Sequence, residues 1–136
     1  MGELSPIVVT TPHEIKWQDA PPSMGEGWQL AVLEGDISQA GSPYTLRTKT
    51  PDAFLVPPHW HPADEHLTVI EGVLVVGLGE KIDPTTEREL PAGSYVVMPK
   101  GVRHYVWNKG ETVVQMQGIG PFEVNFVNAS SALGQF

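Results

Sequence analysis

The chain alternates apolar and polar residues over several short segments, which is typical of β-strands with one buried face. Residues 44–49 alternate in this way, and residues 122–127 repeat the pattern later in the chain. Residues 73–78 are almost continuously apolar, which predicts a strand buried on both faces. Further strands are predicted at residues 7–9, 13–17, 28–33, 67–70, 95–98, 104–107 and 112–117.

Glycine and proline interrupt these segments and predict tight turns between short strands. The chain contains 14 Gly and 13 Pro. Residues 71–72 predict a turn, and residues 108–111 predict a hairpin that pairs 104–107 with 112–117. Residues 11–14 match a helix-capping box, but no helical spacing of apolar residues follows, so a strand is favoured there. About ten short strands and almost no helix predict an all-β sandwich or barrel.

Length, charge and composition narrow the choice of class and partner. The 136 residues suit one domain, so residues 1–136 are expected to form a single domain with a loose tail at 129–136. The net charge of −8 argues against nucleic acid or an anionic membrane surface as partner, and no apolar run is long enough to cross a bilayer. The lack of cysteine excludes disulfides and thiolate metal sites. No signal peptide is visible, so the cytoplasm is expected, with the periplasm as the alternative if a leader has been removed.

A cluster of histidines carries the candidate chemistry. His59 and His61 are two residues apart, so on an extended chain their side chains point to the same side of a sheet. Glu65 keeps the same parity if the chain stays extended through residues 62–64. Two imidazoles and a carboxylate on one side of a sheet make a metal site with open positions. His104 is a fourth candidate ligand, which folding must bring to the others.

A single histidine is more often a surface residue or a satisfied polar residue than a metal ligand. Here three of the five histidines fall within eight residues, and His104 lies in a second segment punctuated by glycine and proline. We therefore predict one divalent transition metal bound by His59, His61, Glu65 and His104. Imidazole and carboxylate ligands suit Fe, Mn, Ni, Co or Zn and do not choose among them. Because ligation requires neutral imidazoles, the metal is predicted to dissociate as the pH falls below about 6.5.

Two sequence motifs together resemble those of the cupin superfamily. The first motif spans residues 53–72 and the second spans residues 93–108. The matching positions are His59, His61, Glu65 and Gly72 in the first motif, and Gly93, Pro99, Gly101, His104 and Asn108 in the second. Two positions depart from the pattern, Ala53 in place of glycine and Ser94 where aspartate is frequent. Both lie at turns, so they bear on turn geometry rather than on the metal.

The resemblance implies a double-stranded β-helix, the jelly-roll barrel of cupins, with the four side chains binding one metal inside it. The chain looks most similar to small single-domain cupins related to the ChrR-like domain and to small dioxygenases. A metal-dependent, Fe(II)-type oxygenase of a small organic substrate is therefore expected. The alternatives are a metal-dependent lyase, isomerase or hydrolase, and a non-catalytic sensor or storage module.

Other residues are expected to shape the pocket or the assembly. Aromatic side chains that could line a pocket or fill the core are Phe54, Trp60, Tyr95 and Trp107. Gln115 and Gln117 share one face of a strand and are candidates for hydrogen bonding in the pocket, or else face solvent. His66 has the opposite parity to Glu65 and is expected to point outward. Cupins are often homodimers, and residues 7–9 could exchange as a strand between two copies or form an edge strand of their own sheet.

Overall fold

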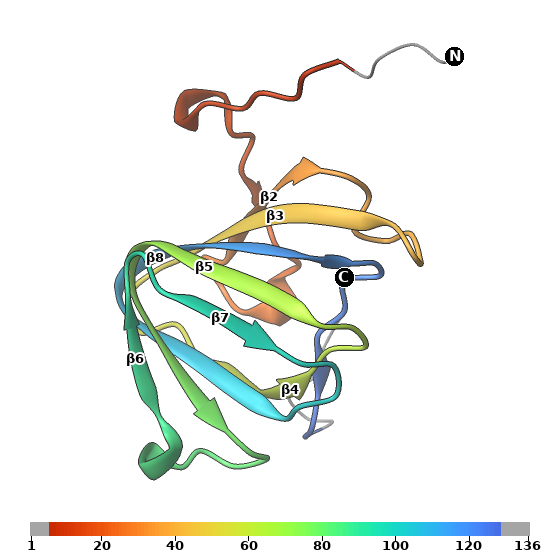
Figure 1. Cartoon of the computed structure of the whole chain (residues 1–136). Helices are drawn as coiled ribbons and strands as arrows, with labels where there is room; N and C mark the ends of the chain where they lie inside the picture. The colour runs from red at the N-terminus through yellow and green to blue at the C-terminus, as the bar shows by residue number, and fades with distance from the viewer. Residues whose placement is uncertain (1–5, 129–136) are drawn as a thin grey trace.

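The computed structural model describes residues 6–128, and its strands form an antiparallel sheet that curls into a barrel (Figure 1). Two strands are much longer than the rest, β5 (Glu65–Leu78) and β8 (His104–Ile119), and they pair along their whole length. The other strands are β1 (Gln18–Asp19), β2 (Gln29–Glu34), β3 (Pro43–Thr50), β4 (Val56–Trp60), β6 (Arg88–Pro91), β7 (Tyr95–Met98) and β9 (Asn125–Phe126). Short 3-10 helices cover Pro12–Glu14, Pro22–Met24 and Pro84–Thr86.

Strands β5 and β8 bend midway, so that each runs through both walls of the barrel (Figure 1). On one side of the bend β5 pairs with β7 and β8 pairs with β3, and on the other β5 pairs with β6 and β8 with β4. The bend in β5 is at Gly72, whose φ of 82° only glycine adopts easily, and the register with β8 shifts on either side of Glu71. Gly110, with a φ of 74°, lies in β8 between the residues that pair across this bend.

The structure differs from the predicted strands in four places. Residues 104–119 form one continuous strand rather than a hairpin turning at 108–111, and residues 71–72 form a bulge within β5 rather than a turn between two strands. The predicted strand at 13–17 is replaced by the 3-10 helix Pro12–Glu14, where the Thr11 hydroxyl donates to the Glu14 carboxylate at 2.9 Å but makes no side-chain cap to the backbone, so the capping box does not form. Residues 7–9 are exposed and lie outside any strand, on an arm that extends from the barrel (Figure 1).

The barrel interior is built in layers that follow the strand register. On the inner face of β8, Gly118, Met116 and Val114 each lie between a residue of β3 and a residue of β5. The flanking pairs are Tyr44 with Glu65, Leu46 with Leu67, and Thr48 with Val69. Because side chains alternate along strands, these inward positions share one interior. The Gly118 layer thus carries the polar side chains of Tyr44 and Glu65, and apolar side chains fill the Met116 layer next to it.

Among the helices of residues 6–128, none combines the length and the apolar character that a membrane span requires. The predicted tail at 129–136 lies outside the described residues.

Candidate metal centre

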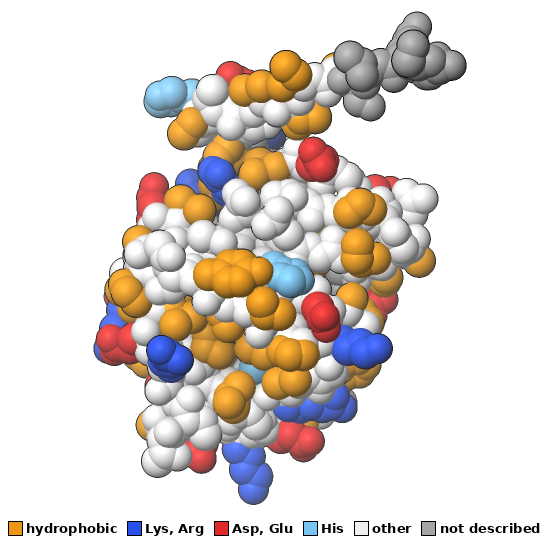
Figure 2. Space-filling model, in the orientation of Figure 1, with side chains coloured by type: hydrophobic (Ala, Val, Ile, Leu, Met, Phe, Trp, Pro, Cys, Tyr) orange, Lys and Arg blue, Asp and Glu red, His pale blue; other side chains and the backbone are white. Residues whose placement is uncertain are grey.

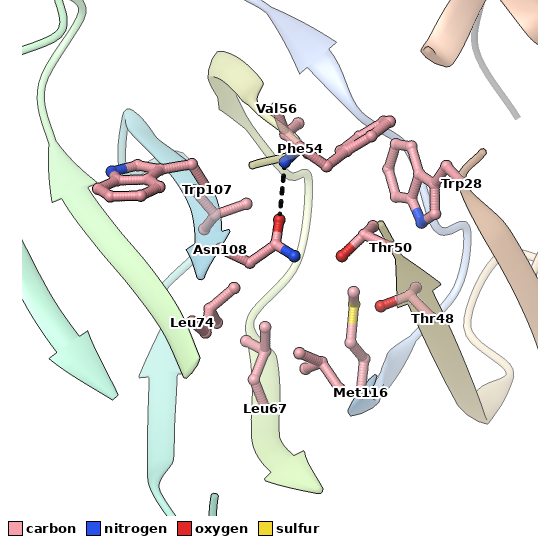
Figure 3. Close-up of a pocket in the computed structure, with 12 residues that line it drawn as sticks. Trp28, Thr48, Thr50, Phe54, Val56, Leu67, Leu74, Trp107, Asn108 and Met116 are labelled. Carbon is pink, nitrogen blue, oxygen red and sulfur yellow. Dashed lines mark hydrogen bonds between the residues drawn. The ribbon is translucent and has the colours of Figure 1, made fainter. Parts of the chain in front are cut away.

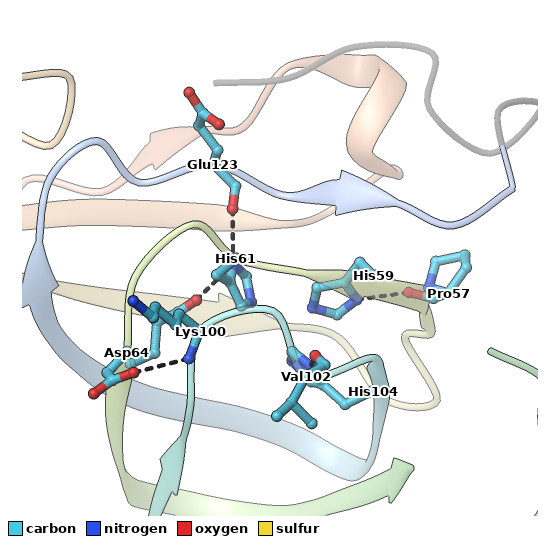
Figure 4. Close-up of polar contacts among 9 residues, drawn as sticks. Pro57, His59, His61, Asp64, Lys100, Val102, His104 and Glu123 are labelled. Carbon is cyan, nitrogen blue, oxygen red and sulfur yellow. Dashed lines mark hydrogen bonds and ion pairs between the residues drawn. The ribbon is translucent and has the colours of Figure 1, made fainter. Parts of the chain in front are cut away.

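The three histidines of the two motifs meet inside the barrel (Figure 4). His59 lies in β4 opposite His104 at the start of β8, and His61 follows β4 on the same face. All three side chains are buried, and one nitrogen of each lies within 4.8 Å of the others. Folding therefore brings His104 to the H-x-H pair.

A backbone carbonyl fixes the orientation of each ring (Figure 4). The contacts are His59 Nδ1 to the Pro57 carbonyl at 2.6 Å, His61 Nδ1 to the Glu123 carbonyl at 2.7 Å, and His104 Nδ1 to the Val102 carbonyl at 2.9 Å. Because a carbonyl only accepts, each Nδ1 must carry the proton and donate it. The neutral ring then has its lone pair on Nε2, which is the arrangement of most metal-binding histidines.

Glu65 lies beside this group and does not complete it as a fourth member. Its carboxylate Oε2 is 2.6 Å from His61 Nδ1, and its side chain is buried. The Nδ1 proton is aligned with the Glu123 carbonyl, so Oε2 has no hydrogen bond in spite of this short distance. A buried carboxylate oxygen without a donor is costly unless a cation compensates it. Ligation of a metal by Glu65 stays a prediction. The position of the carboxylate beside His61 and the lack of a hydrogen-bond donor to Oε2 both suit a metal ligand.

The electrostatic environment keeps two of the three rings neutral. Burial lowers the pKa of His59 well below 6.5, and the neighbouring His104 and His61 lower it further. Burial also lowers the pKa of His104 to about 4. Burial acts to lower the pKa of His61 as well, but the neighbouring Glu65 carboxylate and the hydrogen bond to the Glu123 carbonyl outweigh it and raise the pKa. Protons therefore compete with a metal first at His61 rather than equally at all three histidines.

Aromatic rings from the segment after β8 cover the histidines. Phe122 stacks on His61 with ring centres 6.0 Å apart, and Phe126 meets His59 edge-on at 6.1 Å. The same segment supplies the Glu123 carbonyl. Sequence reasoning assigned it only a strand, although the shared parity of residues 122, 124 and 126 was a signal that they face the interior.

A cavity of about 50 Å³ lies within the barrel next to the apolar layer (Figure 3). Of the six residues predicted to line a pocket, Phe54 and Trp107 line this cavity, together with Trp28. The hydroxyl-bearing side chains of Thr48 and Thr50 add polar groups to its wall. The cavity is therefore mostly apolar, with a few hydrogen-bonding groups on one side.

The other four pocket candidates lie outside that cavity, although Gln117 and Tyr95 line other hollows of the surface, so their role in a pocket stays a prediction. Trp60 packs under the Arg103 guanidinium, 4.9 Å from its ring centre. Gln115 and Gln117 have the opposite parity to Met116, so they face outward, and the Gln115 amide oxygen accepts from Arg47 Nε at 2.9 Å.

Tyr95 is 61% exposed, and its hydroxyl lies 2.7 Å from His66 Nδ1 on the outer face of the sheet. On this face, apolar side chains gather around a histidine over β5 and β7 (Figure 2). His66 thus points outward, as its parity predicted.

Comparison with known proteins identifies the family. A family model described as "Cupin domain" matches residues 46–119, which is more than half of the chain. A germin-like protein 9-3 of Oryza sativa subsp. japonica is 39% identical over 61 residues, or 44% of this chain and 28% of that protein. The chain thus matches little more than a quarter of the length of this relative.

Solved structures share the fold at low sequence identity. An acetylacetone dioxygenase from Acinetobacter johnsonii superposes with a TM-score of 0.70 at 14% identity, over 100% of this chain and 87% of that one. The polyketide cyclase RemF from Streptomyces resistomycificus also has a TM-score of 0.70, at 16% identity, over 90% of this chain and 86% of that one. At these identities the likeness shows the fold alone. Together with the family match, it establishes that the chain is a member of the cupin superfamily with a jelly-roll β-barrel.

Proposed function

We propose that His59, His61 and His104 hold one divalent transition-metal ion, with Glu65 as a fourth ligand, in a metal-dependent enzyme that acts on a small organic molecule. The observation that carries this proposal is the fixed orientation of the three rings. Each Nδ1 faces a backbone carbonyl, so in the neutral form of each ring the remaining nitrogen is an acceptor without a proton. One nitrogen of each ring lies within 4.8 Å of the others, and acceptors gathered so closely in an apolar interior would repel unless a cation lay among them.

The ligand set supports an oxygenase as the first candidate reaction. Three neutral imidazoles and one carboxylate leave net positive charge on a divalent ion and suit Fe(II), which supplies redox chemistry with dioxygen when bound. Phe122 and Phe126 exclude water from two of the rings.

A non-oxidative reaction is the second candidate, because the same ligands suit a metal that acts as a Lewis acid. The two solved structures with a TM-score of 0.70 are named as a dioxygenase and as a cyclase, so the shared fold is compatible with either candidate and does not choose between them. We further propose that residues 1–136 form a single domain.

Metal binding is tested by titrating metal-free protein with Co²⁺ and by elemental analysis of protein purified without added chelator. We expect one metal ion per chain, and its loss in His104→Ala. His66→Ala is the matched control, because it removes an outward-facing imidazole one residue from Glu65. Equal metal content in wild type and His104→Ala would exclude the proposed centre.

The reaction class is tested on the Fe(II)-loaded protein with an oxygen electrode. Acetylacetone and related small carbonyl compounds are the first substrates to try. Substrate-dependent oxygen consumption would support the oxygenase. Conversion of a substrate with Zn²⁺ or Mn²⁺ and no oxygen uptake would support the non-oxidative enzyme, whereas a metal-loaded protein that converts nothing in a broad screen would favour a sensor or storage role.

We also propose a homodimer in which the N-terminal arm of one copy contacts the other. Its support is the exposure of Ile7, Val8 and Val9, at 89%, 61% and 67%, on an arm that extends from its own barrel. Burying these three side chains would contribute several kcal/mol, on the order of 1.5–3 each. Size-exclusion chromatography should show that deletion of residues 1–12 turns a dimer into a monomer. An unchanged dimer would remove the arm from the interface.

A further inference from the structure

A buried tyrosine lies in the same layer of the barrel as Glu65. Tyr44, in β3, is 4% exposed, and it belongs to neither of the two sequence motifs. The register pairs Tyr44 with Gly118 and pairs Glu65 with the same glycine from the other side. The tyrosine and the glutamate are therefore the two inward side chains that flank Gly118.

The glycine between them is what allows the tyrosine to extend toward Glu65. A Cβ on Gly118 would lie 2.9 Å from the Tyr44 hydroxyl oxygen and 3.2 Å from Cζ. The tip of the ring thus lies over the space that a side chain at 118 would fill. Strands β3 and β5 each lie about 4.8 Å from β8, so Glu65 is two strands away from Tyr44. The Tyr44 ring leans across β8 toward the strand that carries Glu65.

Tyr44 also contacts Phe122, the aromatic side chain that covers His61. Phe122 meets the Tyr44 ring edge-on at 6.0 Å and stacks on His61 at the same centre-to-centre distance. Burial, with the Glu65 charge as the second cause, raises the pKa of Tyr44, so the phenol keeps its proton. A protonated phenol beside a carboxylate is a hydrogen-bond donor for it.

We infer that Tyr44 is a positioning residue of the metal centre, whose hydroxyl donates to the Glu65 carboxylate and holds it toward the cation. This inference rests on the proposed metal site and adds to it a residue outside the family motifs. Glu65 has two oxygens, and a carboxylate that ligates a metal through one is commonly oriented by a hydrogen bond to the other. In the structure Oε2 already lies 2.6 Å from His61 Nδ1, so a hydrogen bond from the phenol to the other oxygen would fix how the carboxylate is turned between His61 and the cation.

The test is a double-mutant cycle of Tyr44→Phe and Glu65→Gln in the full chain, with Co²⁺ affinity and the visible spectrum of bound Co²⁺ as readouts. Tyr44→Phe keeps the ring against Phe122 and removes only the hydroxyl. We expect it to weaken Co²⁺ binding by about 10- to 100-fold and to shift the spectrum. The same substitution in the Glu65→Gln background should change neither, because the group that it orients is already altered.

Two further variants separate positioning from a general loss of structure. Tyr95→Phe removes the hydroxyl of an exposed tyrosine on the outer face and should bind Co²⁺ as wild type does. Gly118→Ala retains the phenol but its Cβ would displace the Tyr44 hydroxyl, so it should also weaken Co²⁺ binding; the Asp64 carbonyl, 3.1 Å from that Cβ, would have to shift as well. It also keeps the inference testable if Tyr44→Phe does not fold, which circular dichroism of the metal-free protein would show.

The outcomes distinguish this inference from the proposed function. Unchanged Co²⁺ affinity in Tyr44→Phe, or a full additional loss in the Glu65→Gln background, would overturn the role of Tyr44 and leave the metal site intact. A wild-type protein that binds no Co²⁺ would overturn the metal site itself.

Discussion

At the scale of single residues, the backbone explains one departure from the family pattern. Ala53 occupies the position of the first-motif glycine and has a φ of 58°. An L-residue in this left-handed region is strained by roughly 1–2 kcal/mol, which glycine avoids. The chain keeps the turn in spite of the substitution, because the Ala53 amide donates to the Asn108 carbonyl and the Asn108 side chain accepts from the Phe54 amide.

Ala53→Gly should therefore stabilise the protein. The gain is the relieved strain less the greater freedom of glycine in the unfolded chain, a net of about 0.5–1 kcal/mol. Urea denaturation measures it. Gly101→Ala is the matched control, because Gly101 has a φ of 76° and open space around it, so strain alone should lower its stability by a similar amount. A loss of stability in Ala53→Gly would contradict the strain.

The buried histidines predict how the metal-free protein responds to acid. Between pH 6.5 and about 4 the unfolded chain protonates residue 104 while the folded chain keeps it neutral. The unfolded state then binds more protons, so stability falls as the pH falls, by about 3 kcal/mol for His104 alone. His59 acts in the same direction. His61, with its raised pKa, instead contributes stability below pH 6.5 that is lost as the pH rises through its folded pKa.

The measurement is urea denaturation between pH 4 and 7 in the presence of a chelator. Carboxylates also titrate in this range, so the informative quantity is the difference between wild type and His104→Gln. The free energy of unfolding of wild type should fall relative to that of His104→Gln as the pH falls toward 4. The reason is that the unfolded wild-type chain gains a proton at residue 104 that the folded chain does not bind. A difference independent of pH would show that residue 104 ionises equally in both states.

At the scale of elements, the long strands show where sequence patterns stop being informative. The segments at 67–70, 73–78, 104–107 and 112–117 were all predicted as strands, and all are strands. What failed was the connection between them, because glycine at a positive φ serves a tight turn and a bulge equally well. Choosing between the two requires knowing that β5 pairs with β8 on both sides of the bend, which is long-range information.

At the bend, two glycines should differ in how much stability the protein loses when each is replaced by alanine. Gly72 and Gly110 both have positive φ, but a Cβ on Gly72 would lie 2.4 Å from Thr112 Oγ1 and 2.5 Å from the Glu111 carbonyl, whereas Gly110 has open space. Thermal unfolding should show a loss of about 1 kcal/mol for Gly110→Ala, from strain alone, and about 3 kcal/mol or more for Gly72→Ala. Equal losses would indicate that the backbones separate freely at the bend.

At the scale of the whole molecule, the sequence motifs anticipated which side chains meet but not how they are held. H-x-H parity and the second motif indicated His59, His61 and His104, which the barrel brings together. The carbonyls that orient them belong to the backbone, which carries no residue-type signal. Tyr44 was equally hidden, because its relation to Glu65 exists only through the register of β3 and β5 on β8.

Because the proposed ligands come from β4, β5 and β8, a bound cation should stabilise the folded chain as a whole. At a Co²⁺ concentration about 100 times Kd, binding adds about 2.7 kcal/mol, or roughly 8 °C in Tm for a chain of this size. Differential scanning fluorimetry with and without Co²⁺ measures the shift. His104→Ala should abolish the shift and His66→Ala should retain it. A shift that persists in His104→Ala would place the bound cation elsewhere.

The carbonyl of Glu123 has a consequence for the order in which the centre assembles. His59 and His104 each find their carbonyl two residues earlier in the chain, whereas His61 depends on one that lies 62 residues later. A nascent or refolding chain can thus orient two of the rings locally and must dock its last strand to orient the third. In a refolding experiment, the visible absorption of bound Co²⁺ should reach its final value only when the segment that carries Glu123 has docked, so the bound ion would report completed folding.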